Sequence, residues 1–389
     1  MIKISKEKFI ILAAVFVDIV GFGVVAPVLP FYVESFGATP KTITLLFSIF
    51  ALCSFLSAPV LGALSDRFGR RPVFIASILS TSAGWFVFAG ARTLPILFLG
   101  RIIDGLAAGN VSTAQSYLVD ISKTDKERTA NIGLIGAVIG IGFIVGPLIG
   151  GVLSSISHAL PFWFTGFLAL ANAIVAFFFL PESNAVLRKV KISLNPFRPI
   201  VKAFQNVSLR PYFISWFLFL ASMSGLQAVF ALYISAEFGL GAFEAGLFLT
   251  GMGVIIAFNQ AVMLRKFWLK KFEENSLILG GLLACLAGFL IVSVKLLLIF
   301  ILGVVVLSFS QSLLRAVMVS RIAGEAEDGA KGEILGISSS IVSLSMISGP
   351  IVAGWAFEAN ITLPFFLSAG YAAVAFFFLY FVLRRNRAS

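Results

Sequence analysis

The sequence has few of the residues from which enzymes and metalloproteins build their sites. It contains one histidine, His158, and two cysteines, Cys53 and Cys285, in 389 residues. Both cysteines lie inside apolar runs, which favours a packing role over a disulfide or a metal site. A single histidine cannot form a histidine-based metal cluster, and it leaves a catalytic constellation without its usual base. The composition therefore argues against an enzyme and against a metal site.

Charged residues are also scarce, and the sequence has no ATP-binding motif of the P-loop type. Only 12% of the residues are charged, and no G-x-x-x-x-G-K-[S/T] motif is present to hold ATP. By contrast, 59% of the residues are hydrophobic and the mean hydropathy is +1.03. These values are typical of a protein that crosses a membrane many times.

Twelve apolar runs divide the chain, each of roughly 20 residues, the length that spans a bilayer as a helix. The sequence therefore predicts an all-α integral membrane protein with twelve transmembrane helices. The runs are 9–30, 42–61, 73–91, 95–119, 131–153, 161–181, 210–235, 243–263, 275–294, 296–320, 333–356 and 362–383.

The basic residues predict the orientation of these helices. With the N-terminus in the cytoplasm, 24 of the 29 lysines and arginines lie at the cytoplasmic ends and connections. Only Lys41, Arg92 and Lys295 lie on the other side. The excess predicts that both termini are cytoplasmic. The net charge of +11 then reflects topology, so we expect contact with membrane lipids and no nucleic-acid partner.

An internal repeat divides the helices into two sets. At an offset of 203 residues, Gly146 and Pro147 recur as Gly349 and Pro350, in an ungapped alignment that begins at 131 and ends at 162. Two such six-helix halves form a transporter architecture with a substrate site near the midplane. We therefore predict two pseudo-symmetric six-helix bundles, residues 1–183 and 210–389, joined by a polar linker, residues 184–209.

Several motifs carry a resemblance to a known family. The stretch Gly62-Ala-Leu-Ser-Asp66-Arg67-Phe-Gly69-Arg70-Arg71 resembles the loop signature of the major facilitator superfamily. The segment around Asp18 resembles the first helix of the tetracycline-resistance efflux proteins. Arg101-Ile-Ile-Asp104-Gly105, Gly146-Pro147-Leu-Ile-Gly150-Gly151 and Leu180-Pro181-Glu182-Ser183 are similar to motifs of helices 4, 5 and 6 in the same group.

The resemblance implies the major facilitator fold and a function. It implies a drug:proton antiporter that exports small amphipathic compounds by alternating access. We also expect a monomer, and the compact loops favour a bacterial or archaeal cytoplasmic membrane. Protons would be the coupling ion, with no other cofactor. The alternative is a proton-coupled exporter or flippase of a lipid or metabolite, which would use the same machinery.

Three charged residues inside predicted spans are the candidates for proton coupling. Asp18 lies near the middle of the first span, where a charged acid costs about 2.5–3.5 kcal/mol. Its role is either proton or cation binding or a structural hydrogen bond. Arg101 and Asp104 share one helix face, and they form either a protonation switch or a permanent ion pair.

Two further groups are candidates for conformational control. Asp66, Arg70 and Asp120 form either a cytoplasmic latch, as the resemblance implies, or ordinary surface charge. The glycines of the fifth span either pack helices closely or form a gate. The latch and gate candidates are Gly62, Asp66, Arg67, Gly69, Arg70, Asp120, Gly146, Pro147, Gly150 and Gly151.

Polar residues inside the spans are the substrate-binding candidates. Each alone is compatible with an interhelical hydrogen bond, but together they predict a polar path for a small-molecule substrate. They are Asn110, Gln115, Gln227, Asn259, Gln260, Gln311 and Arg315.

Overall fold

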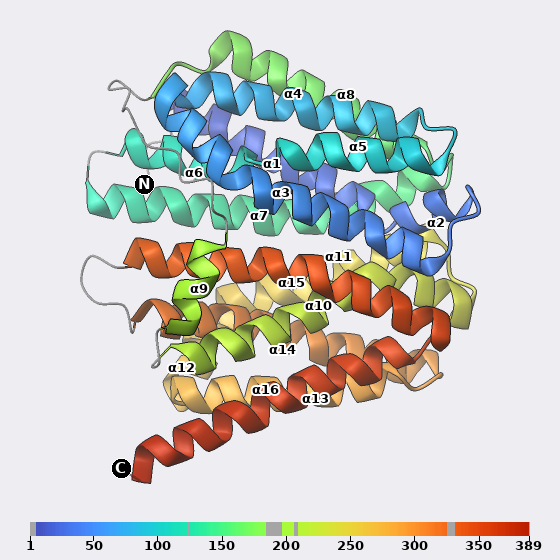
Figure 1. The fold of residues 1–389 in the computed structure, drawn as a ribbon, viewed down its shortest axis with the longest axis vertical. Helices are drawn as coiled ribbons and strands as arrows, with labels where there is room; N and C mark the ends of the chain where they lie inside the picture. Colours follow the sequence, from blue (N-terminus) through green and yellow to red (C-terminus); the bar gives the residue numbers. More distant parts are fainter. Residues whose placement is uncertain (1–4, 123, 184–196, 206–208, 325–330, 389) are drawn as a thin grey trace. The chain divides into compact units, whose positions relative to one another are not determined.

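The structure is a computed structural model that describes residues 5–122, 124–183, 197–205, 209–324 and 331–388. Every regular element in these residues is a helix (Figure 1). The elements are α1 (Lys6–Val25), α2 (Leu29–Glu34), α3 (Pro40–Phe68), α4 (Arg70–Ala89), α5 (Leu94–Leu106), α6 (Asn110–Asp120), α7 (Asp125–Ser154), α8 (Leu160–Phe179), α9 (Arg198–Gln205), α10 (Arg210–Phe238), α11 (Ala242–Phe258), the π-helix η1 (Asn259–Trp268), α12 (Leu269–Lys271), α13 (Glu274–Val292), α14 (Leu297–Gly324), α15 (Lys331–Ala359) and α16 (Leu363–Ala388).

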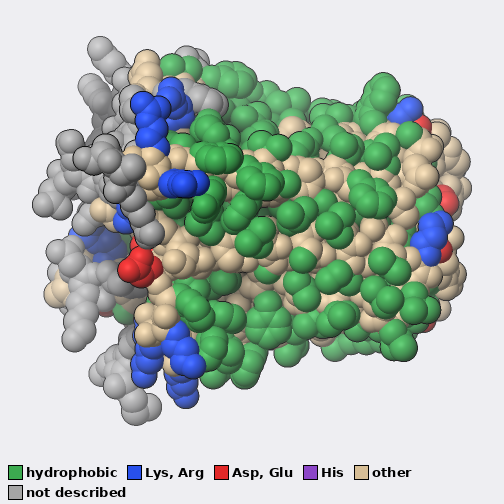
Figure 2. Space-filling view, turned by 90° about the horizontal axis from the view of Figure 1, so that it is seen from below, with side chains coloured by type: hydrophobic (Ala, Val, Ile, Leu, Met, Phe, Trp, Pro, Cys, Tyr) green, Lys and Arg blue, Asp and Glu red, His purple; other side chains and the backbone are tan. Residues whose placement is uncertain are grey.

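The described residues contain 12 segments that are long and apolar enough to cross a membrane. This confirms the prediction of an all-α protein with twelve membrane-spanning helices. On the face drawn in Figure 2, hydrophobic side chains cover the middle and charged side chains gather at the two ends. Such a band is the surface expected where lipid tails replace water.

The chain divides into two compact units. Unit 1 comprises Met1–Ala38, Ile49–Pro196 and Gly241–Thr250, and unit 2 comprises Thr39–Ser48, Phe197–Leu240 and Gly251–Ser389. Each unit thus includes a short segment from the other predicted half, namely the start of α11 in unit 1 and the start of α3 in unit 2. Of the predicted linker 184–209, residues 184–196 and 206–208 lie outside the described residues.

The two units share one kind of close helix contact, in which small glycine residues face the neighbouring helix. In unit 1, α1 packs on α7, and a Cβ on Gly146 would lie 2.8 Å from the Cα of Gly23. In unit 2, α10 packs on α15, and a Cβ on Gly349 would lie 3.0 Å from the backbone nitrogen of Gly225. Small residues let membrane helices approach to this distance. The sequence repeat therefore corresponds to the same packing in both units.

The fourth predicted span is interrupted, which the sequence analysis did not anticipate. The run 95–119 forms two helices, α5 and α6, with non-helical backbone between Leu106 and Asn110. Gly109 lies in this break, where an added Cβ would be 2.9 Å from a methyl carbon of Leu61. Irregular backbone at membrane depth is tolerated where protein covers it, as in the discontinuous helices of transporters.

Candidate functional site

A chain of polar side chains runs between α1, α4 and α6 inside unit 1. Asn110, the first residue of α6, donates from Nδ2 to Oδ1 of Asp18 at 2.7 Å. The same amide nitrogen lies 3.4 Å from the hydroxyl of Thr81, which is near enough to the Asp104 carboxyl to interact with it. The break before α6 thus places Asn110 beside Asp18 and Thr81, which come from two other helices.

The second acid is paired with an arginine on its own helix. Asp104 Oδ2 lies 3.2 Å from Nη1 of Arg101, in the i, i+3 arrangement that the sequence predicted. The guanidinium of Arg101 also lies 4.3 Å from the centre of the Phe50 ring and 5.1 Å from that of Trp85. Aromatic faces help to hold a cation away from water. The sequence analysis missed Phe50, Trp85 and Thr81 because their partners come from other helices.

The two acids differ in accessibility. Arg101 is 2% exposed, Asp104 is 5% exposed and Asn110 is 4% exposed, whereas Asp18 is only half-buried. The amide oxygen of Asn110 is buried and has no hydrogen-bond partner among the described residues. A protonated Asp18 can donate a hydrogen bond to such an oxygen, whereas an ionised one accepts from Nδ2. Asn110 therefore offers a partner to Asp18 in both protonation states.

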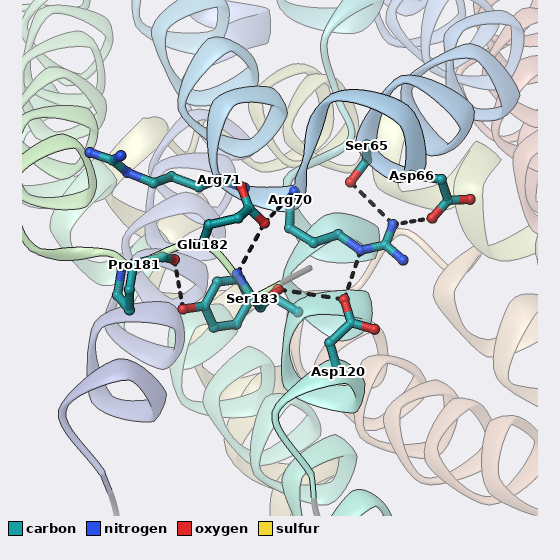
Figure 3. A network of polar contacts seen from close by, with 9 residues as sticks. Ser65, Asp66, Arg70, Arg71, Asp120, Pro181, Glu182 and Ser183 are labelled. Atoms are coloured by element: carbon teal, nitrogen blue, oxygen red, sulfur yellow. Dashed lines mark hydrogen bonds and ion pairs between the residues drawn. The ribbon is translucent and has the colours of Figure 1, made fainter. Parts of the chain in front are cut away.

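The structure brings three of the latch candidates together at one end of unit 1 (Figure 3). The guanidinium of Arg70 lies 2.6 Å from Asp66 Oδ1 and 2.9 Å from Asp120 Oδ2. It also donates to the hydroxyl of Ser65 at 3.2 Å. One cation therefore joins the end of α3, the start of α4 and the end of α6. A charge shared between two acids contributes more than an isolated exposed pair.

A third acid completes this network, and the sequence analysis had not assigned it to the latch. The carboxylate of Glu182, just after α8, accepts hydrogen bonds from the backbone nitrogens of Arg70 at 2.8 Å and Arg71 at 3.1 Å. These nitrogens lie at the start of α4, where the helix dipole favours an anion. Gly69 has φ 105°, and a Cβ there would overlap the Glu182 carboxylate.

Of the two glycines among the latch candidates in this region, only one lies at the turn. Gly69 alone separates α3 from α4, whereas Gly62 lies inside α3 with open space around it. Gly62 therefore takes no part in the turn. The side chain of Arg67 is stacked on the neighbouring Phe68 ring at 5.3 Å, and it joins no ion pair with another described residue.

The glycines of α7 fall into two groups. Gly142, Gly146 and Gly150 face α1 so closely that added Cβ atoms would meet its side chains or backbone, whereas Gly133, Gly136 and Gly140 face open space. On another side of α7, a Cβ on Gly151 would lie 3.1 Å from the carbonyl oxygen of Phe243, at the start of α11. The carbonyl oxygen of Pro147 also borders this segment.

Two of the polar substrate-binding candidates hydrogen-bond to other side chains or to the backbone. Asn110 donates to Asp18, and Asn259 donates to the Phe309 carbonyl at 3.3 Å and accepts from Trp268 Nε1 at 2.8 Å. The other candidates make no hydrogen bond or ion pair with any residue in the described part of the chain, and all are exposed or half-buried. These are Gln115, Gln227, Gln260, Gln311 and Arg315.

Comparison with known proteins decides the family. The model of the Major Facilitator Superfamily matches residues 11–293. The chain belongs to the major facilitator superfamily. It is therefore a membrane transporter and not an enzyme, and the family resemblance predicted from its motifs is confirmed.

Two relatives of this major facilitator protein are resistance proteins. "Multidrug resistance protein 1" of Bacillus subtilis (strain 168) is 30% identical over 369 residues, which cover 92% of each chain. "Tetracycline resistance protein, class C" of Escherichia coli is 28% identical over 364 residues, 92% of this chain and 91% of that protein. The similarity to these resistance proteins extends over both halves of the sequence.

A solved structure supports the fold. The crystal structure of the human organic anion transporter MFSD10 (TETRAN) has a TM-score of 0.73, with 24% identity, covering 97% of this chain and 100% of that one. At this level of identity the likeness concerns the fold alone. The predicted major facilitator fold is confirmed.

Proposed function

We propose that the protein exports small amphipathic compounds in exchange for protons, by alternating access. The observation that carries the proposal is the polar chain that links Asp18 to Asp104 through Asn110 and Thr81. Ionisable residues inside membrane spans are costly and mark ion pathways. The printed names of the relatives, which concern multidrug and tetracycline resistance, support export of drug-like compounds.

In this proposal the two acids have different tasks. The half-buried Asp18 takes up the proton, and Asn110 offers the Asp18 carboxyl a hydrogen-bond partner in either protonation state. A proton that reaches Asp104 removes the negative charge that holds Arg101, and the guanidinium is then free to take another partner. A proton moving with the membrane potential supplies about 2.3 kcal/mol per 100 mV. Protons are then the coupling ion, and no other cofactor is needed.

The remaining predictions belong to the same proposal. The polar candidates that make no hydrogen bond or ion pair with a described residue, including Gln227, Gln311 and Arg315, line the substrate path. The protein works as a monomer in a prokaryotic cytoplasmic membrane, with both termini in the cytoplasm and the basic surface against anionic lipids. Neither a metal nor a nucleic acid takes part.

Substrate-driven proton movement in proteoliposomes tests the proposal. We expect an imposed pH gradient, acidic inside, to collapse faster when a lipophilic cation, a tetracycline or a zwitterionic drug is added outside, as a fluorescent pH reporter would show. Liposomes without protein control for passive leakage of protonated drug. If no compound accelerates the collapse although the protein remains folded, drug antiport is wrong and a lipid or metabolite becomes the substrate to test.

A further experiment tests the latch. Replacing Arg70 by alanine leaves Asp66 and Asp120 facing each other without the cation between them. We expect this to shift the equilibrium between the two conformations of the alternating-access cycle by about 1–2 kcal/mol. Drug-driven proton release should slow roughly tenfold.

The neighbouring Arg67 provides the matched control for this variant. Its side chain is exposed and stacks on Phe68, so Arg67→Ala removes the same charge from the same turn and is expected to transport at the normal rate. Equal rates in both variants would contradict the latch and leave Arg70 as ordinary surface charge.

A further inference from the structure

A second polar site lies in unit 2, at the end of α15 that leads into α16. The ammonium of Lys41, from the start of α3, lies 2.7 Å from Oε2 of Glu358 and 4.4 Å from the centre of the Trp355 ring. The other carboxylate oxygen, Oε1, accepts a hydrogen bond from the backbone nitrogen of Lys41 at 3.0 Å. One oxygen therefore holds the start of the helix, and the other holds the ammonium.

An apolar groove adjoins this site. Trp355 is 64% exposed, and it lines a shallow, open groove together with Ile351, Val352, Ala359 and Leu363. The exposed indole thus has a cation beside it and an apolar hollow next to it.

We infer that this groove binds amphipathic quaternary ammonium compounds, whose cation takes the place of the Lys41 ammonium while the apolar part fills the groove. An aromatic face beside a carboxylate is the combination that recognises such cations. Lys41 shows that an ammonium fits between Trp355 and Glu358. The side chains of Lys41 and Glu358 are 39% and 23% exposed, and ion pairs that solvent reaches are usually worth little, so a ligand can compete for the carboxylate.

The alternative is a simple clamp between α3 and α15, and the two interpretations predict opposite effects of one substitution. If Lys41 competes with a ligand, then Lys41→Gln frees the site and strengthens binding. If the pair only clamps the helices, then Lys41→Gln and Glu358→Gln disturb the groove in the same way. Glu358→Gln removes the charge that attracts the ligand, so binding is expected to weaken under our inference.

Photolabelling of the full-length chain tests the inference without any transport. The probe is (4-benzoylbenzyl)trimethylammonium, and its control is the neutral isostere in which carbon replaces the nitrogen. The protein is held in nanodiscs of phosphatidylglycerol, so that no choline headgroup competes. Labelled peptides that contain residues 351–367 are quantified by mass spectrometry. We expect Lys41→Gln to increase labelling about three- to fivefold, and Glu358→Gln and Trp355→Leu to decrease it about fivefold.

A second ion pair in unit 2 supplies the matched control. Lys295 lies 2.8 Å from Glu237 and is 57% exposed, so Lys295→Gln is expected to leave labelling of the groove unchanged. Trp355→Leu alters an exposed side chain, so it keeps the test valid even if Glu358→Gln fails to fold. Equal labelling by the neutral isostere, or a decrease in Lys41→Gln, would overturn the inference. Because no gradient is applied, neither result depends on proton-coupled export.

Discussion

Replacing Asp18 by asparagine is expected to leave the protein folded but to lower drug-driven proton release roughly 100-fold, the lower end of what a positioned proton-transfer group contributes. A carboxamide has nearly the same shape and can still hydrogen-bond with Asn110, which now lies 2.7 Å from Oδ1 of Asp18. It cannot take up a proton at physiological pH. The variant should therefore lose coupling to protons while it keeps the substrate path.

Two assays on the same proteoliposomes separate these properties. Collapse of an imposed pH gradient reports proton coupling, whereas exchange of labelled for unlabelled substrate without a gradient reports the substrate path. We expect Asp18→Asn to fail the first assay and to retain the second. Glu34→Gln, which removes an exposed acid at the end of α2, should behave as the unchanged protein in both. Normal proton release in Asp18→Asn would show that the proton is carried elsewhere.

Asp18 is a cleaner target than Asp104 because of what each substitution leaves behind. Asp104→Asn removes the counter-charge of Arg101, whose side chain is 3% exposed. Leaving one partner of a buried ion pair without the other costs about 3–5 kcal/mol. A loss of transport in Asp104→Asn would therefore mix lost coupling with lost stability, whereas Asp18 has no cation that depends on it in the structure described here.

The elements that the sequence predicted well are those set by local patterns. Long apolar runs determine the twelve spans because a helix of about 20 residues satisfies its own backbone hydrogen bonds in lipid. The contacts of Arg70 with Asp66 and Asp120 were predictable because two of the three residues share one short connection and the third ends a neighbouring span. The pairing of Arg101 with Asp104 follows from helical spacing.

The contacts that the sequence did not reveal depend on tertiary structure. Asn110 reaches Asp18, 92 residues away in sequence, only because the helix breaks before it, and the apolar pattern of 95–119 gives no sign of the break. Glu182 was noticed as part of a motif, but its place over the start of α4 depends on the packing of α4 on α8. The signal that was available is Gly69, because a glycine with positive φ leaves room for that carboxylate.

Replacing Gly150 by alanine is expected to destabilise the protein by about 1–3 kcal/mol, as overpacking of a close contact does. A Cβ on Gly150 would overlap the carbonyl oxygen of Val24 and lie 2.9 Å from its Cα. These are backbone atoms of α1, so no side-chain rotation can relieve the contact. Size-exclusion chromatography after graded heating in detergent measures the loss of monodisperse protein.

Gly140→Ala is the matched control, since it makes the same change on the same helix where nothing lies within 4 Å. Helix propensity alone favours alanine over glycine by about 1 kcal/mol at both positions. Propensity therefore predicts two stabilised variants, whereas packing predicts that only Gly140→Ala is stable. The repeat shows why the sites differ: the counterpart of Gly150 in unit 2 is Ala353, whose Cβ faces Gly225, where a second Cβ would lie 3.3 Å away. The alanine is accommodated there because the facing residue is glycine, whereas Gly150 faces the backbone of Val24. Two stabilised variants would mean that α1 and α7 are less tightly joined than the structure indicates.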